Sequence, residues 1–192
     1  IVYNTKKTRC MYIGLKQLKT VAPVKQFLYG EVLRWVTEIK YLGCFITCDF
    51  SDDRDIKRQM RAIYCRGNIL ARKFSNCSTD VKKQLFKSYL SCLYCSQLWC
   101  QYTKKSLNDV RVAYNNVYRN LLGIRSRLSI RFEYLVNDIH CFTVLHRKLM
   151  HKLHMRLLAS CNSIVSSIVF SPYFMYHSIL NDNWVKSTYP LL

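Results

Sequence analysis

The periodicity of the sequence changes within residues 38–74, and this change constrains the fold more than any other feature. Residues 38–47 (EIKYLGCFIT) alternate in the period of a β-strand. An acidic segment at 51–55 follows, and the residues after it recur at helical spacing. Ser51 or Asp52 can accept hydrogen bonds from the first free amides of a helix. The stretch therefore predicts a strand that leads directly into a long helix.

Residues 1–50 predict a small β unit. A polar turn at 4–8 lies between two apolar stubs, and the second stub, 10–13, predicts a short strand. The apolar runs 24–28 and 32–36 flank a Tyr-Gly-Glu turn, which is typical of a hairpin because glycine readily adopts a positive φ. A unit of this size has no room for a large core, so we expect it to complete a sheet whose other part is missing.

The residues from 51 onward predict a bundle of amphipathic helices. Further helices are expected from about 78, from the capping pair Ser106 and Asp109, and over 141–159, with a shorter segment at 131–136. The expected inward residues are Ile56, Met60, Ile63, Leu70 and Phe74 in the first helix; Val81, Leu85, Tyr89, Cys92 and Leu93 in the second; Val110, Ala113, Tyr114, Val117 and Leu121 in the third; and Phe142, Leu145, Leu149 and Leu153 in the last.

The expected fold class is α+β, a small antiparallel β unit followed by a mostly helical, basic bundle. The expected divisions are 1–50 for the β unit, 51–128 for a first helical part and 129–192 for a helical extension and tail. The chain starts at Ile1 within strand-like sequence, and we expect it to be a fragment of a longer protein.

Positive charge is concentrated in the helical part. The chain has 30 Lys and Arg against 11 Asp and Glu, and residues 56–130 hold fifteen basic residues and two acids. Most protein surfaces intersperse the two signs, so this bias indicates a polyanionic partner, first nucleic acid and second an anionic membrane surface. We expect salt-sensitive contact with phosphates, without base readout. The candidate residues are Arg54, Lys57, Arg58, Arg61, Arg72, Lys82, Lys83 and Lys87, and the interleaved Tyr64, Tyr89, Tyr114 and Tyr118 are predicted as core rather than as stacking platforms.

No metal site is expected in the chain. Three groups have spacings that zinc could use, but none forms two well-separated ligand pairs, so core packing is favoured. The groups are Cys92, Cys95 and Cys100; Cys44 and Cys48; and His140, Cys141 and His146. The acids Asp52, Asp53 and Asp55 are better explained as a helix cap than as a metal cluster. No nucleophile elbow, P-loop or His-Glu-x-x-His helix is present.

The cysteines and the C-terminal tail bear on the cellular location of the protein. No export signal precedes the ten cysteines, so we expect them to be reduced and buried, and the protein to be intracellular, in nucleus or cytoplasm, and not secreted. Residues 157–181 carry no Lys, Arg, Asp or Glu, but six serines, Asn162, Pro172 and His177 interrupt them. This pattern disfavours a membrane span, which needs about 20 mostly apolar residues.

Several stretches taken together resemble the carboxy-terminal part of reverse transcriptases from non-LTR retrotransposons of the jockey type. The likeness covers about residues 1–160, and its motifs are short but ordered and spaced as in that family. The stretches are NTKKTRCMYIG, EIKYLGCFIT, SDDRDIKRQMR, RGNILARKFSNCSTDVKKQLFKSYLSCLYCSQLW and VRVAYNNVYRNLLGI.

The resemblance implies roles for particular residues. Lys7, with Lys6 as the alternative, matches a lysine near the incoming nucleotide, which supports catalysis by protonating the leaving pyrophosphate. Tyr41, Leu42 and Gly43 match the primer grip, which holds the primer 3′ end. The helices from 52 to 122 match the thumb, which grips the RNA template and RNA/DNA duplex by its backbone.

The departure from the family is large. Its two-metal chemistry uses carboxylates from a Phe/Tyr-x-Asp-Asp turn before the first strand and from a strand further upstream, and neither lies there in this chain. The parent is expected to be an RNA-directed DNA polymerase that uses Mg²⁺, with the missing fingers and palm in the same polyprotein. This chain alone is expected to be inactive. The alternative is a non-enzymatic basic helical remnant that binds nucleic acid or acts as an interaction surface.

Overall fold

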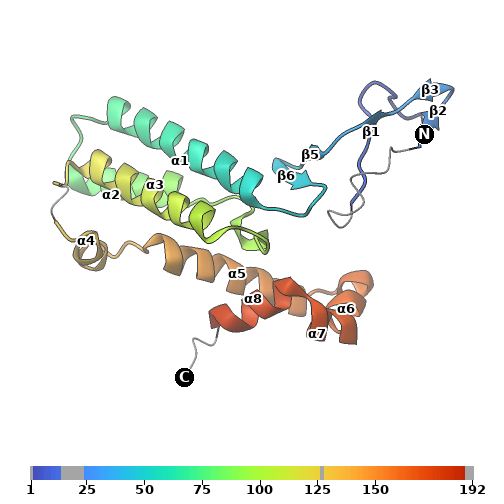
Figure 1. Cartoon of the computed structure of the whole chain (residues 1–192). Helices are drawn as coiled ribbons and strands as arrows, with labels where there is room; N and C mark the ends of the chain where they lie inside the picture. Colours follow the sequence, from blue (N-terminus) through green and yellow to red (C-terminus); the bar gives the residue numbers. More distant parts are fainter. Residues whose placement is uncertain (1, 14–23, 126–127, 189–192) are drawn as a thin grey trace. The chain divides into compact units, whose positions relative to one another are not determined.

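The computed structural model describes residues 2–13, 24–125 and 128–188 (Figure 1). The fold is α+β, as the sequence predicts, with small sheets in the N-terminal part and helices after it. The chain divides into two compact units, Ile1–Asp55 and Ile56–Leu192, which we call the β unit and the helical unit.

The β unit contains three two-stranded sheets among its described residues. The hairpin predicted at 24–36 is confirmed, and its turn residues Tyr29 and Gly30 both have positive φ, at 51° and 82°. One pair of strands is parallel, whereas the sequence predicted antiparallel pairing throughout. The parallel pair is β1 (Arg9–Cys10) with β4 (Arg34–Trp35), and the antiparallel pairs are β2 (Phe27–Leu28) with β3 (Glu31–Val32) and β5 (Glu38–Tyr41) with β6 (Cys44–Thr47).

Residues 38–47 form a hairpin, so the prediction of one continuous strand was wrong. Leu42 and Gly43 have φ values of 46° and 86° and reverse the chain between β5 and β6. Positive φ at both central residues characterises the type I′ turn, whose twist matches that of paired strands. The hairpin tip is exposed to solvent, with Tyr41 60% and Leu42 74% exposed.

Helix α1 (Asp53–Lys73) begins where the acidic segment predicts. The Asp53 amide donates to Ser51 Oγ at 3.4 Å, which confirms Ser51 as a capping residue. Asp55 is only 2% exposed, and its Oδ1 accepts from the Phe45 amide of β6 at 3.1 Å. One acid of the segment therefore also ties the helix start to the hairpin.

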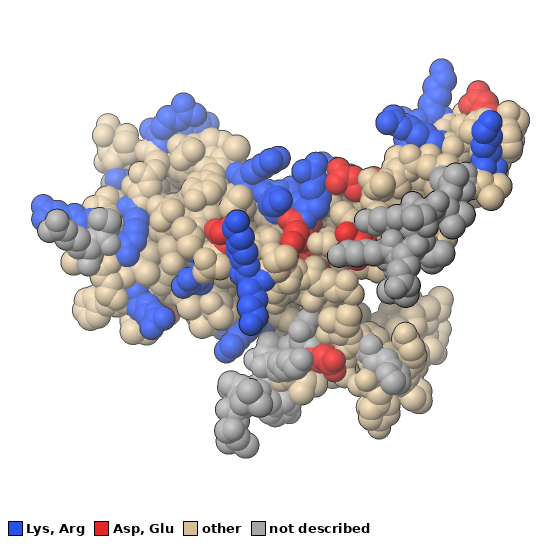
Figure 2. Space-filling view, viewed as in Figure 1, with Lys and Arg blue, Asp and Glu red and all other residues tan. Residues whose placement is uncertain are grey.

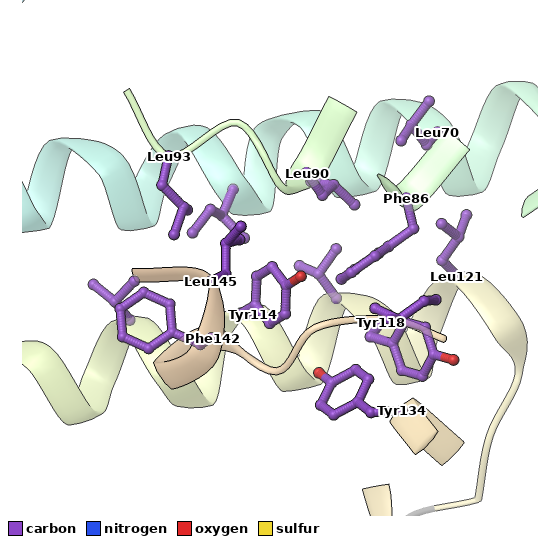
Figure 3. Close-up of a cluster of buried hydrophobic side chains, with 14 of the residues drawn as sticks. Leu70, Phe86, Leu90, Leu93, Tyr114, Tyr118, Leu121, Tyr134, Phe142 and Leu145 are labelled. Carbon is purple, nitrogen blue, oxygen red and sulfur yellow. The ribbon is translucent and has the colours of Figure 1, made fainter. Parts of the chain in front are cut away.

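The helical unit packs around α1 and α3. The predicted inward row of α3 is buried throughout, and so are Ile56, Ile63 and Leu70 on α1 (Figure 3). Gly123 ends α3 with φ 66°, as predicted, whereas the N-cap is Thr103 rather than Ser106. The remaining elements are α2 (Thr79–Leu85), a π-helical turn (Phe86–Leu90), a 3-10 turn (Ser96–Leu98), α3 (Lys104–Leu122), α4 (Ile130–Val136), α5 (Phe142–Leu158), α6 (Ser163–Val169), α7 (Pro172–His177) and α8 (Ile179–Thr188).

Aromatic rings fill the centre of this core. Phe86 meets Tyr114 and Tyr118 edge to face, with ring centroids 4.9 and 4.8 Å apart, and Tyr118 lies 4.8 Å from Tyr134 (Figure 3). Tyr134 and Phe142 belong to the same buried cluster as the residues of α1 and α3. The core therefore continues past residue 128.

The second helix differs from the prediction because its geometry changes midway. After α2 the chain makes a π-helical turn, and the buried residues are Phe86, Leu90 and Leu93. Tyr89, predicted to face inward, lies in the π turn and is 55% exposed; Val81, also predicted inward, lies in α2 before the turn and is 44% exposed. A π turn inserts an extra residue per turn and rotates the following side chains by about 100° relative to an α-helix.

The C-terminal helices α6 to α8 leave large apolar side chains on the surface. Ile164 is 69% exposed, and Tyr173 and Tyr176 are each 75% exposed. Within the described part of the chain, no helix combines the length and apolar character needed to cross a membrane.

Candidate nucleic-acid interface

Almost all of the excess positive charge belongs to the helical unit. Residues 56–192 contain 21 Lys and Arg and five acids, a net charge of +16 out of +19. Figure 2 shows basic side chains spread widely over the viewed face of the helices, with few acids among them. A surface of this kind raises the local concentration of polyanions.

Helix α1 presents an exposed basic stripe, defined here as Lys57, Arg61, Asn68 and Arg72. All four side chains are exposed, and at about 100° per residue they fall within about 60° of arc on the helix. From Lys57 to Arg72 the stripe rises about 22 Å. The three cations make no hydrogen bond or ion pair with any residue that the structure describes. They are thus accessible to an external anion.

Two other arginines of α1 are held by the protein itself. The Arg66 guanidinium donates to the carbonyl oxygens of Tyr89 and Cys92 at 2.9 and 3.2 Å, and burial lowers the pKa of Arg66. Arg58 donates to the Tyr94 carbonyl and to Gln59 Oε1, each at 3.4 Å. Arg58, a predicted binding residue, therefore anchors the segment after the π turn.

The three predicted lysines of the second helix also have partners. Lys82 Nζ donates to the Ser75 carbonyl at 2.8 Å, and Lys83 pairs with Asp80 at 3.1 Å. Lys87 lies 3.6 Å from Asp138, whose side chain is 94% exposed. These lysines are half-buried, so they are less available to a ligand than the stripe.

Arg54 is engaged within the β unit. Its Nε lies 3.1 Å from Glu38 Oε2, and its guanidinium carbon lies 5.1 Å from the centre of the Phe45 ring. The pair and the ring contact fix the first turn of α1 on the hairpin. Arg54 was predicted as a binding residue, and the structure gives it a partner on the hairpin.

The four tyrosines predicted as core divide into two pairs. Tyr114 and Tyr118 are buried, as predicted, and burial raises the pKa of Tyr114 to about 12. Tyr64 and Tyr89 are 38% and 55% exposed, so for them the prediction was wrong. Tyr64 lies on α1 at the edge of the basic stripe, since it is three residues after Arg61.

The residues assigned by resemblance lie in two turns of the β unit. Lys7 is exposed in a turn that Asn4 closes, because the Lys7 amide donates to Asn4 O and Oδ1, each at 3.1 Å. Tyr41, Leu42 and Gly43 form the exposed tip of the β5–β6 hairpin. Both turns present accessible groups, and they lie at the ends of different sheets.

The histidines and cysteines considered as metal ligands have other surroundings. His146 is buried between Trp99 and Phe142, and its Nε2 lies 2.8 Å from the Ser96 carbonyl, so this nitrogen carries the proton. Eight cysteines have free thiols, and none of these is fully buried, so the prediction that they are buried was wrong. Where the structure describes the chain, no three His, Cys, Asp or Glu side chains come together as a metal site.

One stretch matches the letters of the Phe/Tyr-x-Asp-Asp pattern. Residues 50–53 read Phe-Ser-Asp-Asp, but Phe50 has a φ of 56° and Asp53 is the first residue of α1. The stretch therefore begins a helix rather than joining two strands. The two acids lie at a helix N-terminus, where negative charge is favoured.

Comparisons of the chain with protein-family models, with curated proteins and with solved structures find no match. The candidate interface therefore rests on the chemistry of its own residues and on the sequence resemblance.

Proposed function

We propose that the helical unit binds the sugar-phosphate backbone of RNA/DNA or RNA duplex without sequence preference, as the thumb of a non-LTR retrotransposon reverse transcriptase. The observation that carries the proposal is the basic stripe of α1, where three exposed cations make no hydrogen bond or ion pair with the described part of the chain. A helix that is anchored on its opposite face by Ile56, Ile63 and Leu70 can hold these cations in fixed register.

The β unit has a complementary role in this proposal. The exposed hairpin tip at 41–43 holds the primer 3′ end, and Lys7 supports catalysis by protonating the leaving pyrophosphate. The fingers and the rest of the palm, with the Mg²⁺ ligands, come from the upstream part of the parent polymerase. The chain by itself then binds a template and primer but does not extend the primer.

The stripe is tested by replacing Lys57, Arg61 and Arg72 with Gln in the full chain. Binding of a fluorescent RNA/DNA hybrid is measured between 50 and 300 mM salt. Because each phosphate contact contributes about 0.9 to the slope of log K against log salt, the slope falls by about 2 to 3 and affinity at 0.1 M salt falls roughly 100-fold. The free energy of unfolding is expected to stay unchanged, because the three side chains have no partner among the described residues to lose.

A matched control removes the same charge from another helix. Arg147, Lys152 and Arg156 are exposed on α5, and their replacement by Gln gives the same net charge as the stripe variant. The control is expected to weaken binding much less. Equal losses in the two variants would mean that net charge, and not the stripe, attracts the ligand.

Catalysis is tested separately with the same hybrid, Mg²⁺ and deoxynucleoside triphosphates. We expect binding without extension of the primer. Incorporation of nucleotide by this chain would refute its assignment as a binding fragment. If the chain binds the hybrid without extending the primer, and still binds it after the hairpin tip is altered, the result would favour the alternative of a basic remnant without a primer grip.

A further inference from the structure

Two exposed tyrosines of the helical unit differ from the tyrosines of its core. Tyr114, Tyr118 and Tyr134 are buried, and each hydroxyl has a hydrogen-bond partner: the His140 carbonyl at 3.1 Å, Asn137 Nδ2 at 3.2 Å and Asn115 Oδ1 at 2.9 Å, respectively. Tyr64 and Tyr89 are 38% and 55% exposed, and neither hydroxyl is hydrogen-bonded to any residue that the structure describes. Both rings are therefore partly accessible to an external ligand.

Both rings belong to elements that are anchored in the core of the helical unit. Tyr64 follows Arg61 by three residues and precedes Asn68 by four, and residues at these spacings are neighbours on a helix surface. Its own helix buries the opposite face in the core. Tyr64 therefore borders one edge of the stripe.

Tyr89 is placed on the other side of α1 by three hydrogen bonds. Arg66 donates to the carbonyls of Tyr89 and Cys92, and Gln59 Nε2 donates to the Cys92 carbonyl at 3.2 Å. Gln59 is 1% exposed, so this anchor is well shielded from water. The segment that carries Tyr89 is thus fixed along α1 on the side of Arg66, about 120° around the helix from Arg72.

We propose that Tyr64 and Tyr89 stack on unpaired bases, so that the helical unit binds single-stranded nucleic acid next to the duplex as well as the duplex backbone. The inference rests on the proposed function, since the stripe supplies the phosphate contacts. In a duplex the faces of the bases are stacked on each other and hidden. A tyrosine ring beside a row of cations can stack on the faces of bases in a single strand, and such stacking tolerates any base sequence.

The test compares binding of an oligothymidylate of twelve nucleotides with binding of an abasic strand that has the same number of phosphates. Tighter binding of oligothymidylate is expected, together with a loss of about fivefold or more for Tyr64→Ala and for Tyr89→Ala, since stacking contributes about 1–3 kcal/mol per base. Tyr64→Phe and Tyr89→Phe keep a ring and are expected to bind as the unchanged protein does. Binding of the abasic strand stays the same in all four variants.

Tyr176→Ala, at a 75% exposed ring on α7, is the matched control and leaves both affinities unchanged. Thermal melting of every variant separates lost stacking from lost folding. If an alanine variant unfolds, the preference of the unchanged protein for oligothymidylate over the abasic strand still tests the proposal. Equal binding of the two strands, or alanine variants that bind oligothymidylate normally, would overturn the stacking proposal and leave duplex binding by the stripe intact. Failure of every oligonucleotide to bind would refute the proposed function itself.

Discussion

Gly67 is the position where the packing of α1 on α3 leaves least room, and Gly67→Ala measures that packing directly. A Cβ atom at Gly67 would lie 2.3 Å from Val117 Cγ1 and 3.0 Å from Val117 Cγ2. Carbon atoms in contact normally lie about 3.5–4.0 Å apart, so the two helices would have to separate by roughly 1 Å. Overpacking of this kind costs about 1–3 kcal/mol, while alanine gains up to about 1 kcal/mol in helix propensity.

The expected net result is a decrease of about 1–2 kcal/mol in the free energy of unfolding. Urea unfolding followed by circular dichroism reports it as a lower midpoint with an unchanged m-value. For a chain of this length each kcal/mol shifts the melting temperature by about 2–4 °C, so a decrease of roughly 2–8 °C is expected. Asn68→Ala is the matched control, because Asn68 is the next residue of α1 and is exposed.

Val117→Ala identifies the clash as the cause. Alone it removes two buried carbons and costs about 2–3 kcal/mol. Combined with Gly67→Ala it removes the atoms that the new methyl meets, so the double variant is expected to be more stable than the sum of the single effects by about 1 kcal/mol or more. Strict additivity, or a Gly67→Ala protein as stable as the unchanged chain, would refute the close approach of α1 and α3.

Two further predictions concern a buried histidine and a hairpin turn. Burial lowers the pKa of His146, so as the pH falls the unfolded state binds a proton before the folded state does. The stabilising contribution of the neutral, buried ring is therefore present above about pH 6.5 and is lost as the pH falls below that value. The unfolding midpoint between pH 7.5 and 5.5 is therefore expected to fall less in His146→Gln than in the unchanged chain, and equal pH dependence would contradict this. Gly43→Ala places a side chain at φ 86° and is expected to destabilise the hairpin by about 1 kcal/mol. Faster amide hydrogen exchange in β5 and β6 measures this loss, and Lys40→Ala is the control.

The sequence predicts the long helices well because their apolar period is sustained. The inward rows of α1 and α3 extend over several turns each, and local irregularities do not change their phase. The prediction for the second helix failed for the opposite reason, since a π turn at Phe86–Leu90 shifts the phase of the apolar residues after two turns. Nothing in the residue types there marks a π turn, because tertiary contacts of Phe86 and Leu90 with the core select it.

The hairpin at 38–47 was missed for a related reason. Its turn requires a positive φ at Leu42, a residue with no intrinsic preference for that region. Glycine at the next position was the one local signal. Strand pairing between Glu38 and Thr47, and the link from Asp55 to the Phe45 amide, favour the turn after the chain has folded.

The candidate interface shows why a count of basic residues overstates the available charge. Arg58, Arg61 and Arg66 follow one another on α1 at spacings that a charge pattern treats alike. In the structure Arg58 and Arg66 donate to backbone carbonyls of the segment 89–94, whereas Arg61 is exposed without a described partner. Backbone carbonyls left open by the π turn and the irregular segment after it need donors, and arginine supplies them over a long reach. The same irregular segment therefore uses two of the cations of α1 for folding and carries Tyr89 to the surface, so the fold of this connection decides which cations of α1 remain available to a ligand.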